Sequence, residues 1–146
     1  MGGGIDEVET LSSKSKKFTN LASICLEREL YDLACFNIQQ GIQLLLKAFT
    51  LEKLGYIPRT HSIRELMGNL SRQLNEEDLN EYVKTHRLEL TALEDAYISS
   101  RYFVKEFAKE DAEECIHIAK EVAELVRGTL RAVSYTHLTL PTNREV

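Results

Sequence analysis

The sequence predicts an all-α protein, an up-and-down antiparallel bundle of about five helices. Apolar residues recur every three or four positions through most of the chain, and no segment alternates apolar and polar residues as a strand does. Helix caps and breakers separate these periodic segments, and the connections between them are short, which favours antiparallel neighbours. The length of 146 residues is that of one domain, and 43% of the residues are hydrophobic.

The first two predicted helices form the N-terminal half. The first helix ends near Glu29, with its clearest spacing in its second half. The second helix, 32–54, follows the turn RELYD, in which Asp32 is a candidate N-cap. It is apolar around much of its circumference, which places it in the middle of the bundle or at a subunit contact. Gly55 and Pro58 end it, since glycine accepts a left-handed backbone and proline cannot continue a helix.

Three more helices are predicted after this break. Ser62 and Glu65 form the S-x-x-E pattern of a capping box at the start of the third helix, which carries one clean apolar stripe. The fourth helix is expected over 76–99 and the fifth over 110–132. The first turn of the fifth helix is acidic, as the helix dipole favours.

The two ends of the chain differ from the helical body. Residues 1–17 are expected to be an N-terminal segment that is helical at its end, and residues 18–132 are expected to be the domain. The tail 133–146, VSYTHLTLPTNREV, breaks the helical pattern and resembles the translation of a sequencing adapter. We therefore expect the tail to be non-native and without function.

Composition narrows the function classes. The net charge of −5 argues against a general nucleic-acid binder, although it leaves room for a local basic patch. No apolar run reaches the roughly 20 residues of a membrane span, and no signal-peptide core is present, so we expect a cytoplasmic protein. Cys25, Cys35 and Cys115 show neither CxxC nor Cys/His ligand spacing. We expect reduced thiols, no metal site and no cofactor.

Two polar turns suggest a binding site. If the helices alternate in direction, the turn after the second helix and the turn after the fourth lie at the same end of the bundle. Arg59 and His61 would then share that end with Arg101 and Tyr102, and Lys47 would approach it. The start of the third helix would add unpaired backbone N–H groups and a positive dipole end. This arrangement predicts a nucleotide- or anion-binding site.

Supporting roles are expected for three further residues, Tyr97, Gln40 and Asp95. Arginine would bind phosphate, histidine would add a pH-dependent donor and tyrosine would stack or donate a hydrogen bond. The residues also permit structural interpretations, in which Arg59 is only solvated, Arg101 pairs with Asp95 and the polar ends are only caps. No catalytic residue is assigned.

The ordered motifs resemble a known family. The stretch YDLACFNIQQGIQLLLKAFTLEKLGYIPRTHSIREL, followed by LEDAYISSRYF, resembles the HEPN domain (higher eukaryotes and prokaryotes nucleotide-binding). The resemblance covers about 18–130. The matching positions follow the family order, namely Tyr31-Asp32, Ala34, Phe36, Gln39-Gln40, Leu46-Lys47-Ala48, Thr60-His61, Ala96-Tyr97 and Arg101-Tyr102.

The resemblance implies a helical bundle that is commonly a homodimer. Small prokaryotic members often occur beside a minimal nucleotidyltransferase, with which they are thought to form a toxin–antitoxin-like module. The resemblance therefore implies a protein that binds a nucleotide or such a partner. The alternatives are a ligand-free helical scaffold and a metal-independent RNase toxin that uses Arg101 and His61.

The RNase alternative is weakened by the motif that it requires. HEPN RNases carry R-x(4–6)-H on a late helix, and the formal match here is Arg131 with His137. This histidine lies in the suspect tail. General acid–base cleavage of RNA also needs a titratable group near the 2′-hydroxyl, and nothing in the spacing assigns that role to His61.

Overall fold

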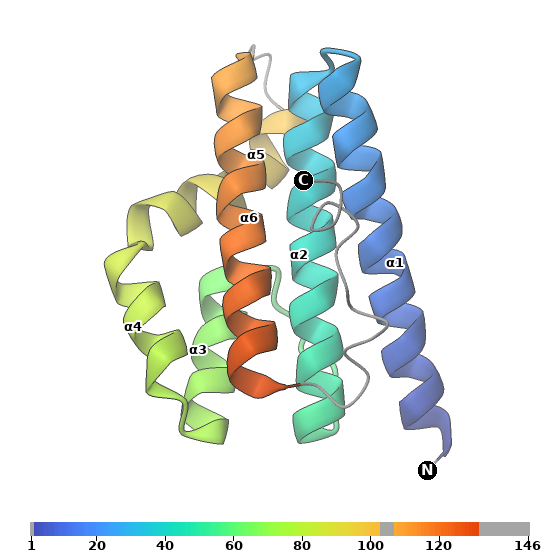
Figure 1. Cartoon of the computed structure of the whole chain (residues 1–146), viewed down its shortest axis with the longest axis vertical. Helices are drawn as coiled ribbons and strands as arrows, with labels where there is room; N and C mark the ends of the chain where they lie inside the picture. Colours follow the sequence, from blue (N-terminus) through green and yellow to red (C-terminus); the bar gives the residue numbers. More distant parts are fainter. Residues whose placement is uncertain (1, 103–106, 132–146) are drawn as a thin grey trace.

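The computed structural model describes the backbone of residues 2–102 and 107–131 and the side chains of residues 6–96 and 107–131. The described backbone forms six helices and no strand, which confirms the all-α prediction (Figure 1). Their bounds are α1 Gly2–Glu27, α2 Tyr31–Leu54, α3 Ile63–Leu74, α4 Glu77–Thr85, α5 Arg87–Tyr102 and α6 Lys109–Leu130. Within these residues, no helix combines the length and the apolar character that crossing a membrane requires.

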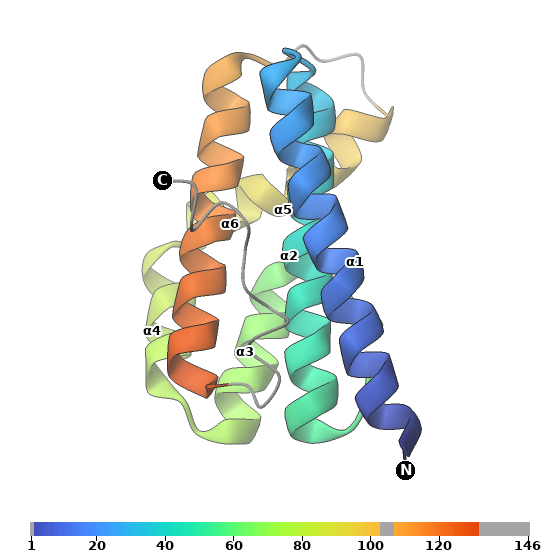
Figure 2. The same ribbon diagram turned by 45° about the vertical axis from the view of Figure 1, so that its right-hand side comes forward.

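The helices do not alternate in direction as expected. α1 runs up the bundle and α2 runs down it, but α3 and α6 also run down, parallel to α2 (Figures 1 and 2). The cause is residues 55–62, which we call the return segment. These eight residues carry no helix, and at about 3.3 Å per extended residue they span roughly 26 Å. The chain therefore climbs back along α2 before α3 begins, and the alternation of helix directions, from which a shared bundle end was expected, is wrong.

The predicted fourth helix is two helices, α4 and α5, which meet at His86. The His86 N–H still donates to the Tyr82 carbonyl at 2.9 Å, but its backbone (φ −118°, ψ 32°) leaves the helical region. The imidazole stacks on the Tyr82 ring with centroids 3.9 Å apart. The apolar stripe is interrupted here, and Leu88 is 83% exposed. The break turns α5 back across α2, so the expected five helices become six (Figure 1).

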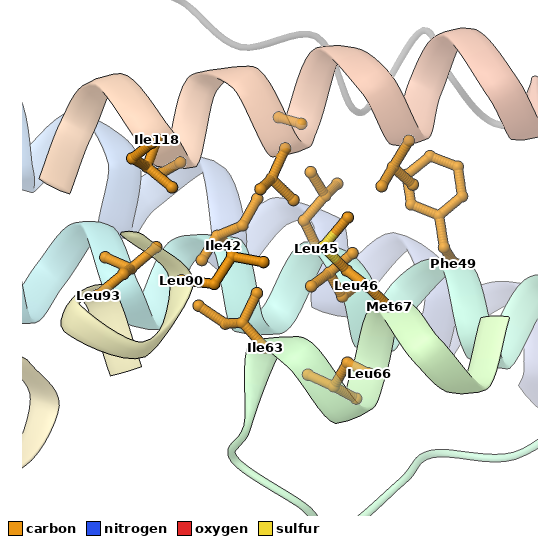
Figure 3. Close-up of a cluster of buried hydrophobic side chains, with 14 of the residues drawn as sticks. Ile42, Leu45, Leu46, Phe49, Ile63, Leu66, Met67, Leu90, Leu93 and Ile118 are labelled. Atoms are coloured by element: carbon orange, nitrogen blue, oxygen red, sulfur yellow. The ribbon is translucent and has the colours of Figure 1, made fainter. Parts of the chain in front are cut away.

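α2 lies in the middle of the molecule, as its apolar circumference predicted. It contacts α1, α3, α5 and α6. Its leucines and Phe49 meet side chains from α3, α5 and α6 in one cluster (Figure 3). Each large side chain buried there stabilises the fold by about 1.5–3 kcal/mol relative to exposure. The fully buried members include Leu45, Leu46, Phe49, Ile63, Leu66, Met67, Leu70, Leu79, Leu90, Leu93 and Val122.

α1 is continuous through the polar stretch Ser12–Ser15, and it includes most of the segment 1–17. Buried hydroxyls in and after this stretch bond to main-chain carbonyls. Ser15 Oγ donates to the Gly41 carbonyl at 2.7 Å, and Thr19 Oγ1 donates to the Ser15 carbonyl at 2.9 Å. A Cβ at Gly41 would lie 2.9 Å from Thr19 Oγ1, so glycine is required for this close approach of α1 to α2.

Helix ends test the capping predictions. Gly55 closes α2 with φ 87° and an N–H donated to the Leu51 carbonyl, which confirms its role. Ser62 Oγ accepts the Glu65 N–H at 3.1 Å, which confirms the N-cap of α3. The prediction for Asp32 is wrong, because α2 begins one residue earlier. Asp32 lies in its first turn and accepts the following N–H, at 2.8 Å.

Candidate functional site

The return segment brings His61 onto the middle of α2. His61 Nδ1 lies 2.8 Å from Gln43 Oε1, a hydrogen bond in which the imidazole donates when Nδ1 carries its proton. Gln43 is only 4% exposed. Its Nε2 is buried and has no hydrogen-bond partner within the described part of the chain. A buried amide donor left in this state is rare in folded proteins and calls for an explanation.

Two other predicted residues share this face of α2. Gln40 and Lys47 stand three residues before and four residues after Gln43, the spacing of neighbours on one helix face. Gln40 Nε2 donates to Gln39 Oε1 at 3.1 Å. Lys47 is 9% exposed, and burial lowers the pKa of its ammonium group from the usual value. We call Gln40, Gln43, Lys47 and His61 the Gln43 site.

The start of α3 is occupied by a carboxylate from α5. Glu94 Oε2 accepts the Arg64 N–H at 2.7 Å and the Ser62 hydroxyl at 3.0 Å. Glu94 Oε1 accepts from Arg64 Nη2 at 3.0 Å. We call Ser62, Arg64 and Glu94 the Glu94 tie. The expectation of unpaired N–H groups here is wrong for Arg64 and Glu65, since a carboxylate and the Ser62 hydroxyl already accept them.

Neither Arg64 nor Glu94 was singled out from the sequence. The ion pair is partly buried, with the two side chains 31% and 11% exposed. Its hydrogen bond to Glu94 raises the pKa of Arg64. One signal could have found the pair. An arginine in the first turn of a helix faces the positive dipole end, so it needs an acidic partner from elsewhere.

The remaining return-segment candidate is Arg59, which is exposed and stands two residues before His61. Asp95, by contrast, is exposed on α5 and lines a cavity with Phe107 and Asp111 between α5 and α6. Asp95 therefore belongs to a different surface from the Gln43 site.

The last predicted residues lie on α5. Arg101 and Tyr102 are its final two residues, and Tyr97 lies one turn earlier. The side chains of these three residues are outside the described residues. α5 approaches the return segment through Glu94, and about 10 Å of helical rise separates Glu94 from Arg101. The structure thus brings His61 to Gln43 and Lys47, and it leaves the predicted contact of Arg101 untested.

The formal RNase motif also extends beyond the described chain. Arg131 follows α6 in a left-handed conformation, with φ 52°. His137 and the tail 133–146 lie outside the described residues.

Comparison with known proteins gives a family. The model of the HEPN domain family matches residues 8–129, which is most of the chain. The match begins within α1, ahead of residue 18, where the domain was expected to start. No curated protein and no solved structure matches the chain significantly. With a family match over more than half of its length, the chain belongs to the HEPN domain family.

Proposed function

We propose that this HEPN domain binds a nucleotide, or a minimal nucleotidyltransferase that carries one, at the Gln43 site. Family membership implies a role related to nucleotides or RNA. The observation that supports the location is the buried Gln43 Nε2, which has no hydrogen-bond partner in the described chain and belongs to the amide that His61 contacts.

The donors and cations of the Gln43 site indicate which kind of ligand it would bind. A buried donor without an acceptor costs about 1–3 kcal/mol, which a ligand oxygen would recover. A phosphate or a base carbonyl supplies such an oxygen. Lys47 and Arg59 would supply positive charge, and a charge-assisted contact is roughly twice as strong as a neutral one. The Gln43 site therefore fits an acceptor-rich anion better than it fits an apolar ligand.

Isothermal titration of ATP, GTP, CTP, UTP and a single-stranded RNA 20-mer tests this proposal. We expect Arg59→Ala to weaken binding by roughly tenfold, since an arginine–phosphate contact is worth about 1.5–3 kcal/mol and Arg59 is exposed. His61→Ala should weaken it less. Arg72→Ala removes an exposed arginine from the last turn of α3 and should change nothing. If no nucleotide or RNA binds the folded protein, the scaffold interpretation replaces this one.

Arg101→Ala asks whether the end of α5 joins the same site. We expect a loss of affinity of roughly ten- to a hundredfold, in the same direction as Arg59→Ala. Tyr102→Phe should have a smaller effect, because it removes only a hydroxyl. Unchanged affinity in Arg101→Ala, with a loss in Arg59→Ala, would confine the site to α2 and the return segment.

Two simple experiments distinguish the nucleotidyltransferase-partner hypothesis from the RNase alternative. A minimal nucleotidyltransferase encoded next to this chain would support the toxin–antitoxin-like module, and co-purification of the two proteins would test it. Cleavage of the RNA 20-mer that is lost in His61→Ala and Arg101→Ala would instead make the protein an RNase.

A homodimer is part of the same proposal. The turn between α1 and α2 lies at the top of Figure 1, and large apolar side chains near this turn are exposed. They are Leu21, Ile24, Leu30 and Leu33. A second copy of the chain would cover such side chains. Sedimentation should show a dimer for the wild type and a monomer for Leu33→Glu, and a wild-type monomer at micromolar concentration would contradict it.

A further inference from the structure

Two of the three cysteines lie against each other between α2 and α6. Cys35 of α2 is 0% exposed, while Cys115 of α6 is half-buried. The Cys35 thiol donates toward the Asp111 carbonyl at 3.7 Å, and Asp111 stands one helical turn before Cys115. The two thiols also share a hydrogen bond. Cys115 also packs against the apolar cluster that holds Cys35. A disulfide needs sulfurs about 2 Å apart and Cβ atoms about 3.5–4.5 Å apart, so the two sulfurs must come closer than hydrogen-bond distance to form one.

Cys115 can be reached from the surface. Two cavities of about 330 and 300 Å³ lie between α5 and α6, and both are lined by Ala92, Glu114 and Cys115. Cys35 lines neither of them. The pair therefore has one thiol accessible to a small reagent and one thiol behind it, shielded from water.

We propose that Cys35 and Cys115 are a reversible oxidation site, at which a peroxide forms a disulfide that joins α2 to α6. The balance is two thiols and one hydrogen peroxide, giving one disulfide and two waters. Each sulfur loses one electron, and the peroxide oxygens accept both. A small dithiol such as dithiothreitol would reverse the reaction by thiol–disulfide exchange.

The two thiols have different roles in this reaction. The hydrogen bond to Cys115 and burial both raise the pKa of Cys35, so Cys35 keeps its proton, and Cys115, which lines both cavities, is the thiol that peroxide reaches. The Cys115 thiolate attacks one peroxide oxygen and breaks the O–O bond, which leaves a sulfenic acid on Cys115 and releases hydroxide. The Cys35 sulfur then attacks the Cys115 sulfur and expels that hydroxyl. It leaves as water together with the Cys35 proton.

The surrounding charges favour a neutral oxidant. Asp111 and Glu114 stand beside Cys115 on α6, and Glu89 and Asp95 line the cavities from α5. These carboxylates repel anionic reagents such as oxidised glutathione, whereas they do not exclude hydrogen peroxide. Several carboxylates around cavities of this size create a negative potential, which disfavours the approach of an anion.

Cys25 provides an internal control. It is buried in the same apolar cluster as Cys35, but its sulfur accepts from Asn37 Nδ2 at 3.8 Å and lines neither cavity. Each cysteine also falls on its own tryptic peptide, namely 18–28 for Cys25, 29–47 for Cys35 and 110–120 for Cys115.

The test treats the intact folded protein with hydrogen peroxide, removes the peroxide, unfolds the protein in guanidinium chloride with N-ethylmaleimide to block every remaining thiol, and maps tryptic peptides by mass spectrometry. We expect peptide 29–47 joined to peptide 110–120, with Cys25 blocked by the maleimide. A crosslink that includes Cys25, or oxidation of Cys115 to a sulfinic acid without a crosslink, would overturn the proposal. Oxidised glutathione should form the crosslink at least tenfold more slowly than peroxide does.

Thermal unfolding supplies a second readout. The crosslink closes a long loop, and it should raise the Tm by roughly 10 °C in a manner that dithiothreitol reverses. Cys25→Ser should keep this shift, while Cys115→Ser and Cys35→Ser should lose it. The peptide map of the wild type decides the matter even if Cys35→Ser fails to fold. A crosslinked wild type whose Tm is unchanged would contradict the constraint that we assign to the bond.

Discussion

Two polar clusters meet where the return segment becomes α3, and they differ in how completely their groups are satisfied. In the Glu94 tie, one carboxylate accepts from the Ser62 hydroxyl, the Arg64 N–H and the Arg64 guanidinium. In the Gln43 site, a buried amide N–H₂ has no acceptor in the described chain. Complete networks stabilise a fold, whereas incomplete ones indicate a place where function has overridden stability.

The two clusters are joined by consecutive residues. His61 belongs to the Gln43 site, and Ser62, which caps α3, belongs to the tie. Holding Ser62 against α5 fixes the backbone that presents His61 to α2. The tie therefore acts on the proposed function by positioning, since it contacts no proposed ligand, and the two clusters should respond differently to mutation.

The largest expected effect is that of Glu94→Ala. Removing this carboxylate leaves an arginine, a hydroxyl and a first-turn N–H without their acceptor. Because the groups are partly buried, we expect the free energy of unfolding to fall by about 2–4 kcal/mol. Urea unfolding of the two proteins measures it.

The matched control is Glu113→Ala, which removes an exposed carboxylate from α6 and should cost within about 0.5 kcal/mol. An equal effect in the two variants would show that net charge, rather than the tie, controls stability. In that case the contrast between the clusters would be lost.

Arg64→Ala should cost less, about 1–2 kcal/mol. Its side chain is 31% exposed, and the Glu94 carboxylate still accepts from Ser62 and from the backbone N–H of residue 64. The double variant with Glu94→Ala should be less destabilised than the sum of the single changes, because both remove the same ion pair. Strict additivity in a double-mutant cycle would contradict the direct coupling.

Gln43→Leu should behave in the opposite way. Leucine has a similar volume and removes a buried donor that has no partner, so stability should be unchanged or higher by up to about 1 kcal/mol. Binding of the nucleotide found by titration should weaken at least tenfold. A loss of stability beyond about 1 kcal/mol with binding intact would show that the His61–Gln43 contact is structural.

Much of the fold was predictable because it depends on local patterns. Residues that are close in the sequence determine the helical spacing, the Ser62 cap and the end of α2 at Gly55. The direction of α3 was not predictable in this way. A break after α2 is evident from the sequence, but whether eight residues turn tightly or run back along a helix depends on what they contact, here Gln43 and Glu94. The bend at His86 depends in the same way on packing across α2.

The site was predictable in part. His61, Lys47 and Gln40 were chosen for their chemistry, and the structure places His61 against the face that the other two share. Gln43 is a polar residue next to three leucines in the sequence, but whether its amide finds a partner depends on burial, which composition does not give. Glu94 was missed because its partners lie 30 and 32 residues away along the chain.

Lys47→Met is expected to have the smallest effect on stability, and the direction in which this effect changes with pH is its sharpest test. Burial lowers the pKa of Lys47 in the folded state below its usual value near 10.5, so the unfolded chain binds its proton more tightly. Stability should therefore rise with pH as the folded-state lysine loses its proton, up to about 10.5.

Methionine removes the cost of burying the ammonium group of Lys47. It should therefore stabilise the protein by less than about 1 kcal/mol at pH 7 while weakening nucleotide binding. The advantage of Met over Lys should shrink as the pH approaches 10.5, because a lysine that has lost its proton no longer carries the penalty of a buried charge. Tyrosines and other groups titrate alike in both proteins, so their effects cancel in the comparison. An advantage that is constant with pH, or a destabilised variant, would mean that the ammonium group has an acceptor. Lys47 would then be a satisfied group, like the groups of the Glu94 tie.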